Sequence, residues 1–257
     1  MSGASAERED AALAALLTRA ERVPGGRVES YGPHPDQVIE WYAAATSGER
    51  APVVLVHGGF FRPSIDRTHA RPMAAALAER LNAPVVLMEY RRVSGHPEAA
   101  VADIDAVSDL MEGLSEEPAV WVGHSAGGAL VLQRAFDPVR PAVPTVALAP
   151  VADLRTAVAE RLGDGAVVEW LGARAAAKPS RYARLDPVSL AGDLPERWDR
   201  VVCVHGAEDG TVPPEQSRAV GVPVRLVPEA HHYDLIDPES AAWSEVVAAI
   251  EGVARQP

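Results

Sequence analysis

Residues 123–127 read Gly-His-Ser-Ala-Gly, a pattern that holds a serine nucleophile in a tight turn. An apolar run directly precedes the turn and a helical pattern follows it, which is the strand–turn–helix context that this motif requires. The two glycines leave room for the adjacent strand and helix, so the hydroxyl of Ser125 stands at the start of the helix. The backbone amide of Ala126 is then placed to bind a developing oxyanion. The alternative is a glycine-rich turn in which Ser125 only caps the helix.

Residues 57–59 read His-Gly-Gly and follow another apolar run. Together with the serine motif they resemble the α/β-hydrolases, and among these the carboxylesterases and the kynurenine-formamidase-like group. The resemblance extends from residue 38 to residue 248. In these families the amides of the second glycine and of the next residue face the substrate carbonyl oxygen. The resemblance therefore implies an oxyanion hole made of Gly59, Phe60 and Ala126, whereas the alternative is an ordinary tight turn after a buried strand.

An aromatic pair, Phe60 and Phe61, follows the two glycines. Formamidases carry an aromatic pair here, usually tyrosine and tryptophan, whereas lipases often have a third glycine. We expect Phe61 and His124 to contact the substrate in a compact and partly apolar pocket.

The resemblance also implies an acid and a histidine that follow the serine in this order along the chain. Asp209 lies in a loop after a buried strand and matches the acid position of the family, with Glu208 as the adjacent alternative. His231 and His232 lie in the loop after the last strand, before Tyr-Asp-Leu-Ile. The family pattern places the catalytic base at His232, and His231 stands where glycine is usual. In the alternative interpretation, Asp209 caps the next helix and both histidines are ordinary loop residues.

These residues predict a serine hydrolase that cleaves an ester or amide bond of a small-molecule acyl substrate through an acyl-enzyme. Neutral His232 would take the proton of Ser125, while Asp209 would hold the imidazole and stabilise its charged form. Two alternatives stay open: a thioesterase or peptidase on the same fold, and a non-catalytic ligand-binding protein. No cofactor is expected, because the histidines lack metal-ligand spacing and no G-x-G-x-x-G motif is present. Cys203 lies in an apolar run without an adjacent base, which predicts a packed thiol.

The composition is that of an ordinary globular protein: 257 residues, 47% hydrophobic and 23% charged. A formal net charge of −12 makes nucleic acid and anionic membranes poor partners. The single cysteine excludes an intramolecular disulfide and a cysteine-rich zinc site. No apolar run is long enough for a membrane helix, and acids stand where a signal peptide would carry bases, which predicts a cytoplasmic protein. Nothing in the sequence indicates the oligomeric state.

Short apolar runs alternate with helical patterns, which predicts an α/β-hydrolase fold with a mostly parallel sheet of about eight strands and helices on both faces. Strands are expected at 27–31, 37–43, 52–56, 83–89, 119–122, 145–149, 201–204 and 223–227. Apolar residues at helical spacing predict helices at 11–20, 73–81, 99–114 and 241–253. Residues 153–200 contain no convincing strand, and we expect them to form a cap insertion within a single domain that spans residues 1–257.

Overall fold

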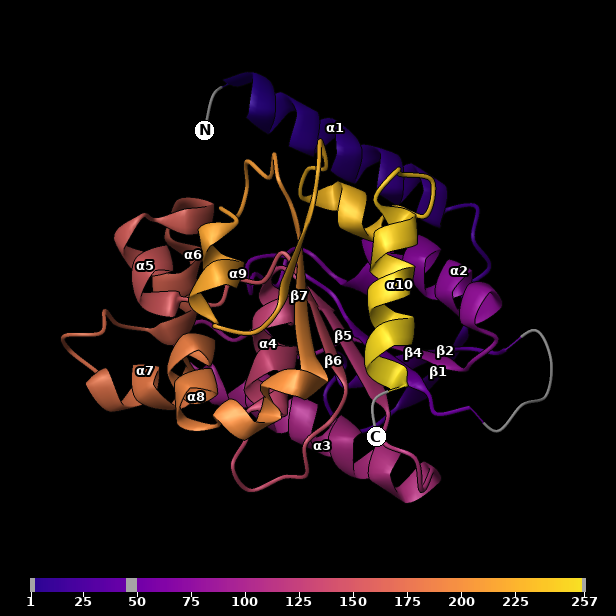
Figure 1. The fold of residues 1–257 in the computed structure, drawn as a ribbon, viewed down its shortest axis with the longest axis horizontal. Helices are drawn as coiled ribbons and strands as arrows, with labels where there is room; N and C mark the ends of the chain where they lie inside the picture. The colour runs from indigo at the N-terminus through magenta and orange to yellow at the C-terminus, as the bar shows by residue number, and fades with distance from the viewer. Residues whose placement is uncertain (1–2, 45–49, 256–257) are drawn as a thin grey trace.

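The computed structural model describes residues 3–44 and 50–255 (Figure 1). Eight strands form one sheet in the order β1-β2-β4-β3-β5-β6-β7-β8. β2 pairs antiparallel with both β1 and β4, and the other neighbouring strands pair in parallel. The strands are β1 (Arg27–Ser30), β2 (Val38–Tyr42), β3 (Val53–Val56), β4 (Val85–Met88), β5 (Val120–His124), β6 (Thr145–Leu148), β7 (Val201–Gly206) and β8 (Val224–Val227). The predicted fold class is confirmed, and each strand overlaps the run that predicted it.

Helices and short 3₁₀ helices (η) connect the strands. They are α1 (Gly3–Ala20), η1 (Arg67–Ala70), α2 (Arg71–Leu81), α3 (Glu98–Leu114), α4 (Ala126–Ala135), α5 (Leu154–Ala159), α6 (Leu162–Leu171), α7 (Pro179–Leu185), α8 (Pro187–Asp193), η2 (Pro195–Arg200), α9 (Glu215–Ala219), η3 (Tyr233–Ile236) and α10 (Trp243–Ala254). α1 begins well before residue 11, where its apolar pattern starts. None of the described helices has the length and apolar character that a bilayer crossing needs.

Two hydrophobic cores lie on opposite faces of the sheet. Val54 and Val56 of β3 pack in one core with residues of α3 and α4. Val53 and Leu55 of the same strand pack in the other core with residues of α2 and α10, and Figure 1 shows α10 lying across this face. Because successive side chains of a strand point to opposite faces, a continuous apolar run is needed where both faces are covered. This burial explains the unbroken β-branched runs in the sequence.

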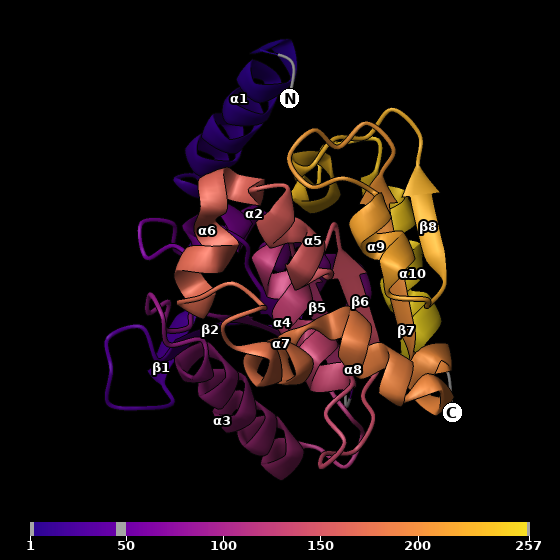
Figure 2. The same cartoon turned by 90° about the vertical axis from the view of Figure 1, so that its left-hand side faces the viewer.

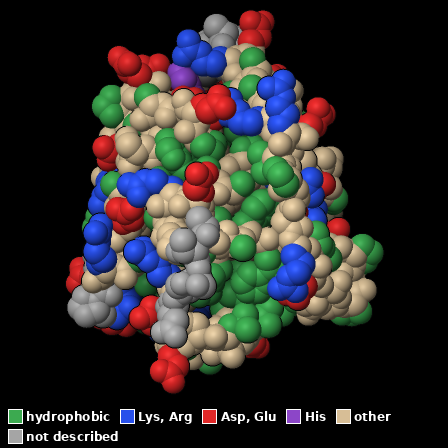
Figure 3. Space-filling view, turned by 90° about the vertical axis from the view of Figure 1, so that its right-hand side faces the viewer, with side chains coloured by type: hydrophobic (Ala, Val, Ile, Leu, Met, Phe, Trp, Pro, Cys, Tyr) green, Lys and Arg blue, Asp and Glu red, His purple; other side chains and the backbone are tan. Residues whose placement is uncertain are grey.

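The chain between β6 and β7 is helical and lies on the side of the sheet that α4 covers. Figure 2 shows α5 to α8 in front of α4 and β5, with α8 packed against α4. α6 contains a kink at residues 163–165, where all three backbones have positive φ. Figure 3 shows the side of the molecule opposite to that in Figure 2. There acidic and basic side chains are interspersed, and hydrophobic side chains gather between them.

Candidate active site

Ser125 lies between the end of β5 and the start of α4. Its φ of 56° and ψ of −117° are strained for a residue with a side chain. The glycines on either side permit this turn: a Cβ on Gly127 would lie 2.2 Å from the carbonyl oxygen of Val56, and one on Gly123 would lie 2.3 Å from that of Gly127. The turn pattern in the sequence therefore reflects a close approach of three backbone segments. Ser125 itself is only 2% exposed.

Asp209 and His232 meet beside the carboxyl end of β7, although they lie in different loops. Asp209 Oδ2 is 2.7 Å from His232 Nδ1, and His205 Nε2 of β7 is 3.3 Å from the same oxygen. The other oxygen, Oδ1, accepts hydrogen bonds of 2.8 Å from the amides of Thr211 and Val212. The carboxylate is thereby fixed in direction by its own loop.

The charges of this pair stabilise each other. Burial opposes ionisation of Asp209, but the charge of His232 and the hydrogen bonds from His205 and His232 hold the pKa of Asp209 well below its usual range. Burial alone would lower the pKa of His232, but the charge and hydrogen bond of Asp209 raise it above the ordinary imidazole value. With Asp209 ionised, Nδ1 of neutral His232 carries the proton and donates a hydrogen bond to the carboxylate, which leaves the lone pair on Nε2.

His232 also lies beside the residue that precedes the candidate nucleophile. The rings of His124 and His232 are 4.5 Å apart between centroids, and His124 Nε2 donates to the carbonyl oxygen of His232 at 3.1 Å. Within the described chain, no hydrogen bond joins the hydroxyl of Ser125 to His232, so that contact stays a prediction. In unliganded enzymes such bonds are often long and shorten when substrate binds.

The two alternatives from the sequence, His231 and Glu208, lie elsewhere. Nε2 of His231 accepts a hydrogen bond from Arg8 of α1, and it is 3.6 Å from a carboxylate oxygen of Glu208. The Glu208 side chain is 56% exposed. Among the described residues, neither side chain forms a hydrogen bond or ion pair with Asp209 or His232.

The loop between β3 and η1 reaches Ser125 from the neighbouring strand. A Cβ on Gly58 would lie 2.9 Å from the Cβ of Ser125, so only glycine fits there. Gly59, Phe60 and Phe61 follow with φ of 123°, 49° and 57°, a run of positive φ that is costly for the two phenylalanines. The amides of Gly59 and Phe60 make no hydrogen bond within the part of the chain that the structure describes. Such a strained loop with free amides is typical of functional sites.

Phe60 and Phe61 differ in their surroundings. Phe60 is half-buried beneath the kink of α6, where a Cβ on Gly163 would lie 2.4 Å from its ring. Arg62 donates to the carbonyl oxygen of Gly163 at 2.9 Å and holds the two segments together. Phe61 is 3% exposed and stacks on Trp170 of α6, with ring centroids 3.9 Å apart. The predicted substrate contacts of Phe61 and His124 stay predictions.

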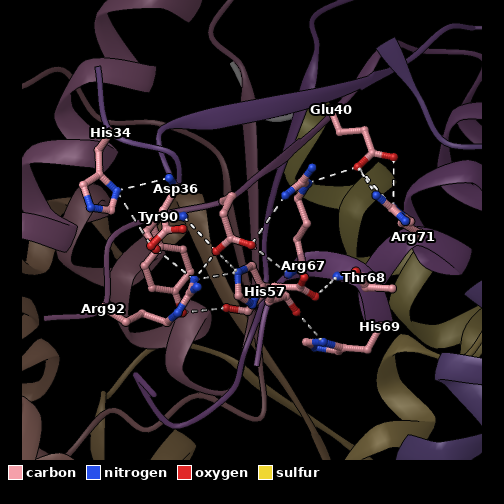
Figure 4. Close-up of polar contacts among 12 residues, drawn as sticks. His34, Asp36, Glu40, His57, Arg67, Thr68, His69, Arg71, Tyr90 and Arg92 are labelled. Atoms are coloured by element: carbon pink, nitrogen blue, oxygen red, sulfur yellow. Dashed lines mark hydrogen bonds and ion pairs between the residues drawn. The ribbon is translucent and has the colours of Figure 1, made fainter. Parts of the chain in front are cut away.

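A buried carboxylate, Glu89, ties together the two ends of this loop, at His57 and Arg67, which Figure 4 labels. It follows β4 directly and is 2% exposed. His57 Nε2 is 2.9 Å from Glu89 Oε1, and the amide of Arg67 donates to Oε2, also at 2.9 Å. The guanidinium of Arg92 pairs with Oε1 as well. Burial opposes the charge of Glu89, but the hydrogen bond and charge of His57 and the charge of Arg92 hold its pKa well below the usual range.

The same network extends to β2, the neighbour of the edge strand β1. Arg67 Nε lies 3.0 Å from Oε2 of Glu40, which is fully buried, and Arg71 pairs with the same carboxylate. The hydroxyl of Tyr90 donates to the carbonyl oxygen of His57 at 3.0 Å. Buried charges of this kind persist only when every member has a partner, so the network holds the loop in one conformation.

Three buried residues of this site were not predicted from the sequence: Glu89, Arg92 and His205. A glutamate at the carboxyl end of a buried parallel strand was a usable signal, because the functional groups of open α/β sheets gather at that edge. His205 also ends an apolar run, and it packs under Asp209. Nothing in the sequence pointed to Glu9 of α1, which contacts the backbone of His232.

Two other chemistries lack support in the residues that the structure describes. No group of three or more His, Cys, Asp or Glu side chains is placed to hold a metal ion there. Cys203 is buried, and burial raises the pKa of its thiol to about 12, so it is neither accessible nor ionised near neutral pH.

The fold and the site together define a class of protein: a mostly parallel sheet that presents a strained serine between a central strand and a helix, with an acid–histidine pair at neighbouring strand ends. Residues 53–250 match the alpha/beta hydrolase family, which is well over half of the chain. The chain belongs to this family, and the resemblance seen in the sequence is confirmed at that level. No curated protein matches the chain.

Several solved structures share the fold. A protein of Silicibacter sp. TM1040, provisionally named a thioesterase, is similar with a TM-score of 0.72 and 21% identity over 98% of this chain and 95% of that chain. Esterase B from Lactobacillus rhamnosis has a TM-score of 0.70 and 18% identity over 98% and 96% of the two chains. Esterase LipW from Mycobacterium marinum has a TM-score of 0.64 and 21% identity over 98% and 87%. At these identities the likeness establishes the fold.

Proposed function

We propose that this protein is a serine hydrolase that cleaves an ester or amide bond of a small molecule through an acyl-enzyme. The observation that carries the proposal is the strained Ser125 at the end of β5, together with an ionised Asp209 paired with His232, whose ring packs against the preceding residue, His124. A serine that only capped α4 would need neither this backbone strain nor a buried acid–histidine pair packed against the residue before it. The esterase names of the Lactobacillus and Mycobacterium neighbours agree with this chemistry.

In the proposed mechanism, Nε2 of His232 takes the hydroxyl proton of Ser125 as the oxygen attacks the acyl carbon. Asp209 stabilises the imidazolium, and the amides of Gly59, Phe60 and Ala126 bind the oxyanion. His232 then gives the proton to the leaving group, and the ester bond to Ser125 remains. Water repeats the cycle and releases the acid. The loss of one oxyanion donor costs about 3–4 kcal/mol of transition-state stabilisation in comparable sites.

The test combines covalent labelling with turnover. Wild-type protein is expected to react with a fluorophosphonate probe at Ser125 and to hydrolyse short-chain p-nitrophenyl esters. Ser125→Ala is expected to abolish labelling and to lower turnover by about 10⁴-fold or more, without a change in melting temperature. Ser244→Ala is a matched control, because Ser244 is exposed on α10 and belongs neither to the proposed triad nor to the oxyanion hole.

The outcomes separate the alternatives. If the wild type neither reacts with the probe nor turns over any acyl substrate, the proposal is wrong and a ligand-binding role is favoured. If Ser125 is labelled and esters are poor substrates, a panel of thioesters, N-formyl anilines and peptides identifies the bond that is cleaved. The name of the Silicibacter neighbour is the reason to include thioesters.

A further inference from the structure

Helix α1 buries a carboxylate on the face that packs against the rest of the protein. Glu9 is 4% exposed, like Leu16 and Ala20, which follow it at helical spacing on the same face. Its neighbours Arg8 and Asp10 are exposed. An apolar residue would be expected at this position, because burial of a carboxylate is costly unless the charge has partners.

Glu9 lies between the two loops that carry Asp209 and His232. Its Oε1 accepts a hydrogen bond of 3.2 Å from the backbone amide of His232. The backbone of Gly210, directly after Asp209, lies close enough to the Glu9 carboxylate to lower its pKa. The second oxygen, Oε2, is buried and has no hydrogen-bond partner among the described residues. One side chain from the N-terminal helix therefore bonds to the loop of His232 and lies close to the loop of Asp209.

Further contacts hold α1 in this position. Arg8 donates to the ring of His231, and Arg19 forms ion pairs with Asp237 and, at 2.9 Å, with Glu239. His231 lies before η3, and Asp237 and Glu239 lie after it. Helix α1 therefore binds the histidine loop on both sides of η3. Figure 1 shows α1 lying along these loops at the end of the sheet where the parallel strands finish.

We propose that Glu9 is a positioning residue that holds the acid loop and the base loop in register and thereby aims His232. This inference rests on the proposed function, because it assigns His232 the role of base. The reason is geometric: the direction of the His232 ring depends on its backbone, and Glu9 is the side chain that bonds to the amide of that residue. Small displacements of a catalytic group have large effects on rate, about 10²-fold for a shift of 1 Å.

The charge of Glu9 adds a second effect. Asp209 is the main cause of the raised pKa of His232, and the nearby Glu9 carboxylate acts in the same direction. Burial also raises the pKa of Glu9, against the attraction of His232. Removal of the Glu9 charge is therefore expected to lower the pKa of His232. Other charged or titratable groups lie close to this pair: Asp209 and Tyr233 on the two loops, His124 with its ring centroid 4.5 Å from that of His232, and Arg8 and Asp10, which flank Glu9 on α1.

The experiment compares two substitutions of Glu9 with one of Glu7, which is exposed on the same helix. Glu9→Ala removes the acceptor, and we expect kcat for a p-nitrophenyl ester to fall by about 10²-fold while KM changes little. Glu9→Gln keeps an acceptor for the His232 amide and removes the charge. We expect it to restore most of kcat and to move the acid limb of the kcat/KM profile to lower pH. Glu7→Gln makes the same change of charge, and we expect it to change neither kcat nor the acid limb of the profile.

The outcomes distinguish this inference from the proposed function. If wild type and Glu7→Gln are both inactive and unlabelled by the fluorophosphonate, the proposed function fails. If wild type is active and Glu9→Ala matches it in kcat, the positioning role is wrong. Should Glu9→Ala not fold, as judged by circular dichroism, Glu9→Gln decides alone: an acid limb that stays in place overturns the inference, and a shift to lower pH supports it.

Discussion

Replacement of Glu89 by glutamine tests the network that supports the loop between β3 and η1. The substitution keeps the shape of the side chain, but it removes the charge that faces Arg92, whose side chain is only 2% exposed. The new amide group would also face a donor, because Oε1 faces His57 and Arg92 while Oε2 accepts from the amide of Arg67. The buried guanidinium of Arg92 would thus lose its anionic partner. The new NH₂ group would also point at another hydrogen-bond donor.

The size of the effect follows from this geometry. When one partner of a buried ion pair is removed, the free energy of unfolding typically falls by about 3–5 kcal/mol, because the other charge stays buried and unpaired. For a chain of this length that corresponds to a fall in melting temperature of roughly 6–20 °C. Glu79→Gln at the exposed end of α2 is the matched control, with an expected change within about 0.5 kcal/mol.

Urea unfolding followed by circular dichroism measures the difference, provided that the slope of the transition is the same for all three proteins. Because the pKa of Glu89 is depressed in the folded state, its charge stabilises the protein above the ordinary carboxyl value of 4.5, and this stabilisation is lost as the pH falls further. The gap between wild type and Glu89→Gln is therefore expected to be constant from pH 6 to pH 8 and to shrink in acid. Equal unfolding midpoints for Glu89→Gln and Glu79→Gln would refute the reasoning.

Three other predictions concern the site and its scaffold. His232→Ala is expected to lower turnover by several powers of ten whereas His231→Gly is tolerated, and steady-state kinetics showing the reverse would place the base one residue earlier. Because Asp209 raises the pKa of His232, the acid limb of kcat/KM is expected to have its midpoint above 6.5, and a midpoint below that value contradicts the assigned pair. Gly127→Ala is expected to destabilise the fold by about 1–3 kcal/mol, since its Cβ would meet a carbonyl oxygen of β3 at 2.2 Å. Gly113→Ala, with open space around it in α3, is expected to stabilise by up to about 1 kcal/mol, and thermal unfolding that ranks the two otherwise would rule out this account.

Features that depend on neighbours in the chain are predictable from the amino-acid sequence. The eight strands follow from apolar runs that only a sheet covered on both faces accommodates. The strained turn at Ser125 follows from glycines placed two residues before and after it. The start of α1 is not predictable in this way. The first half of this helix contacts the histidine loop through the polar side chains of Arg8 and Glu9, so it lacks the apolar periodicity of the second half.

The direction of each of two adjacent side chains, and the contacts between distant residues, depend on the tertiary structure. Side chains next to each other in a loop point in different directions, and the path of the loop decides that His232 faces Asp209 while His231 faces α1. Glu89 and His57 are 32 residues apart in the chain, and Glu9 and His232 are 223 apart. A carboxylate in such a position has no periodicity or motif to mark it, because its burial is tolerable only once the donors from other elements have assembled around it.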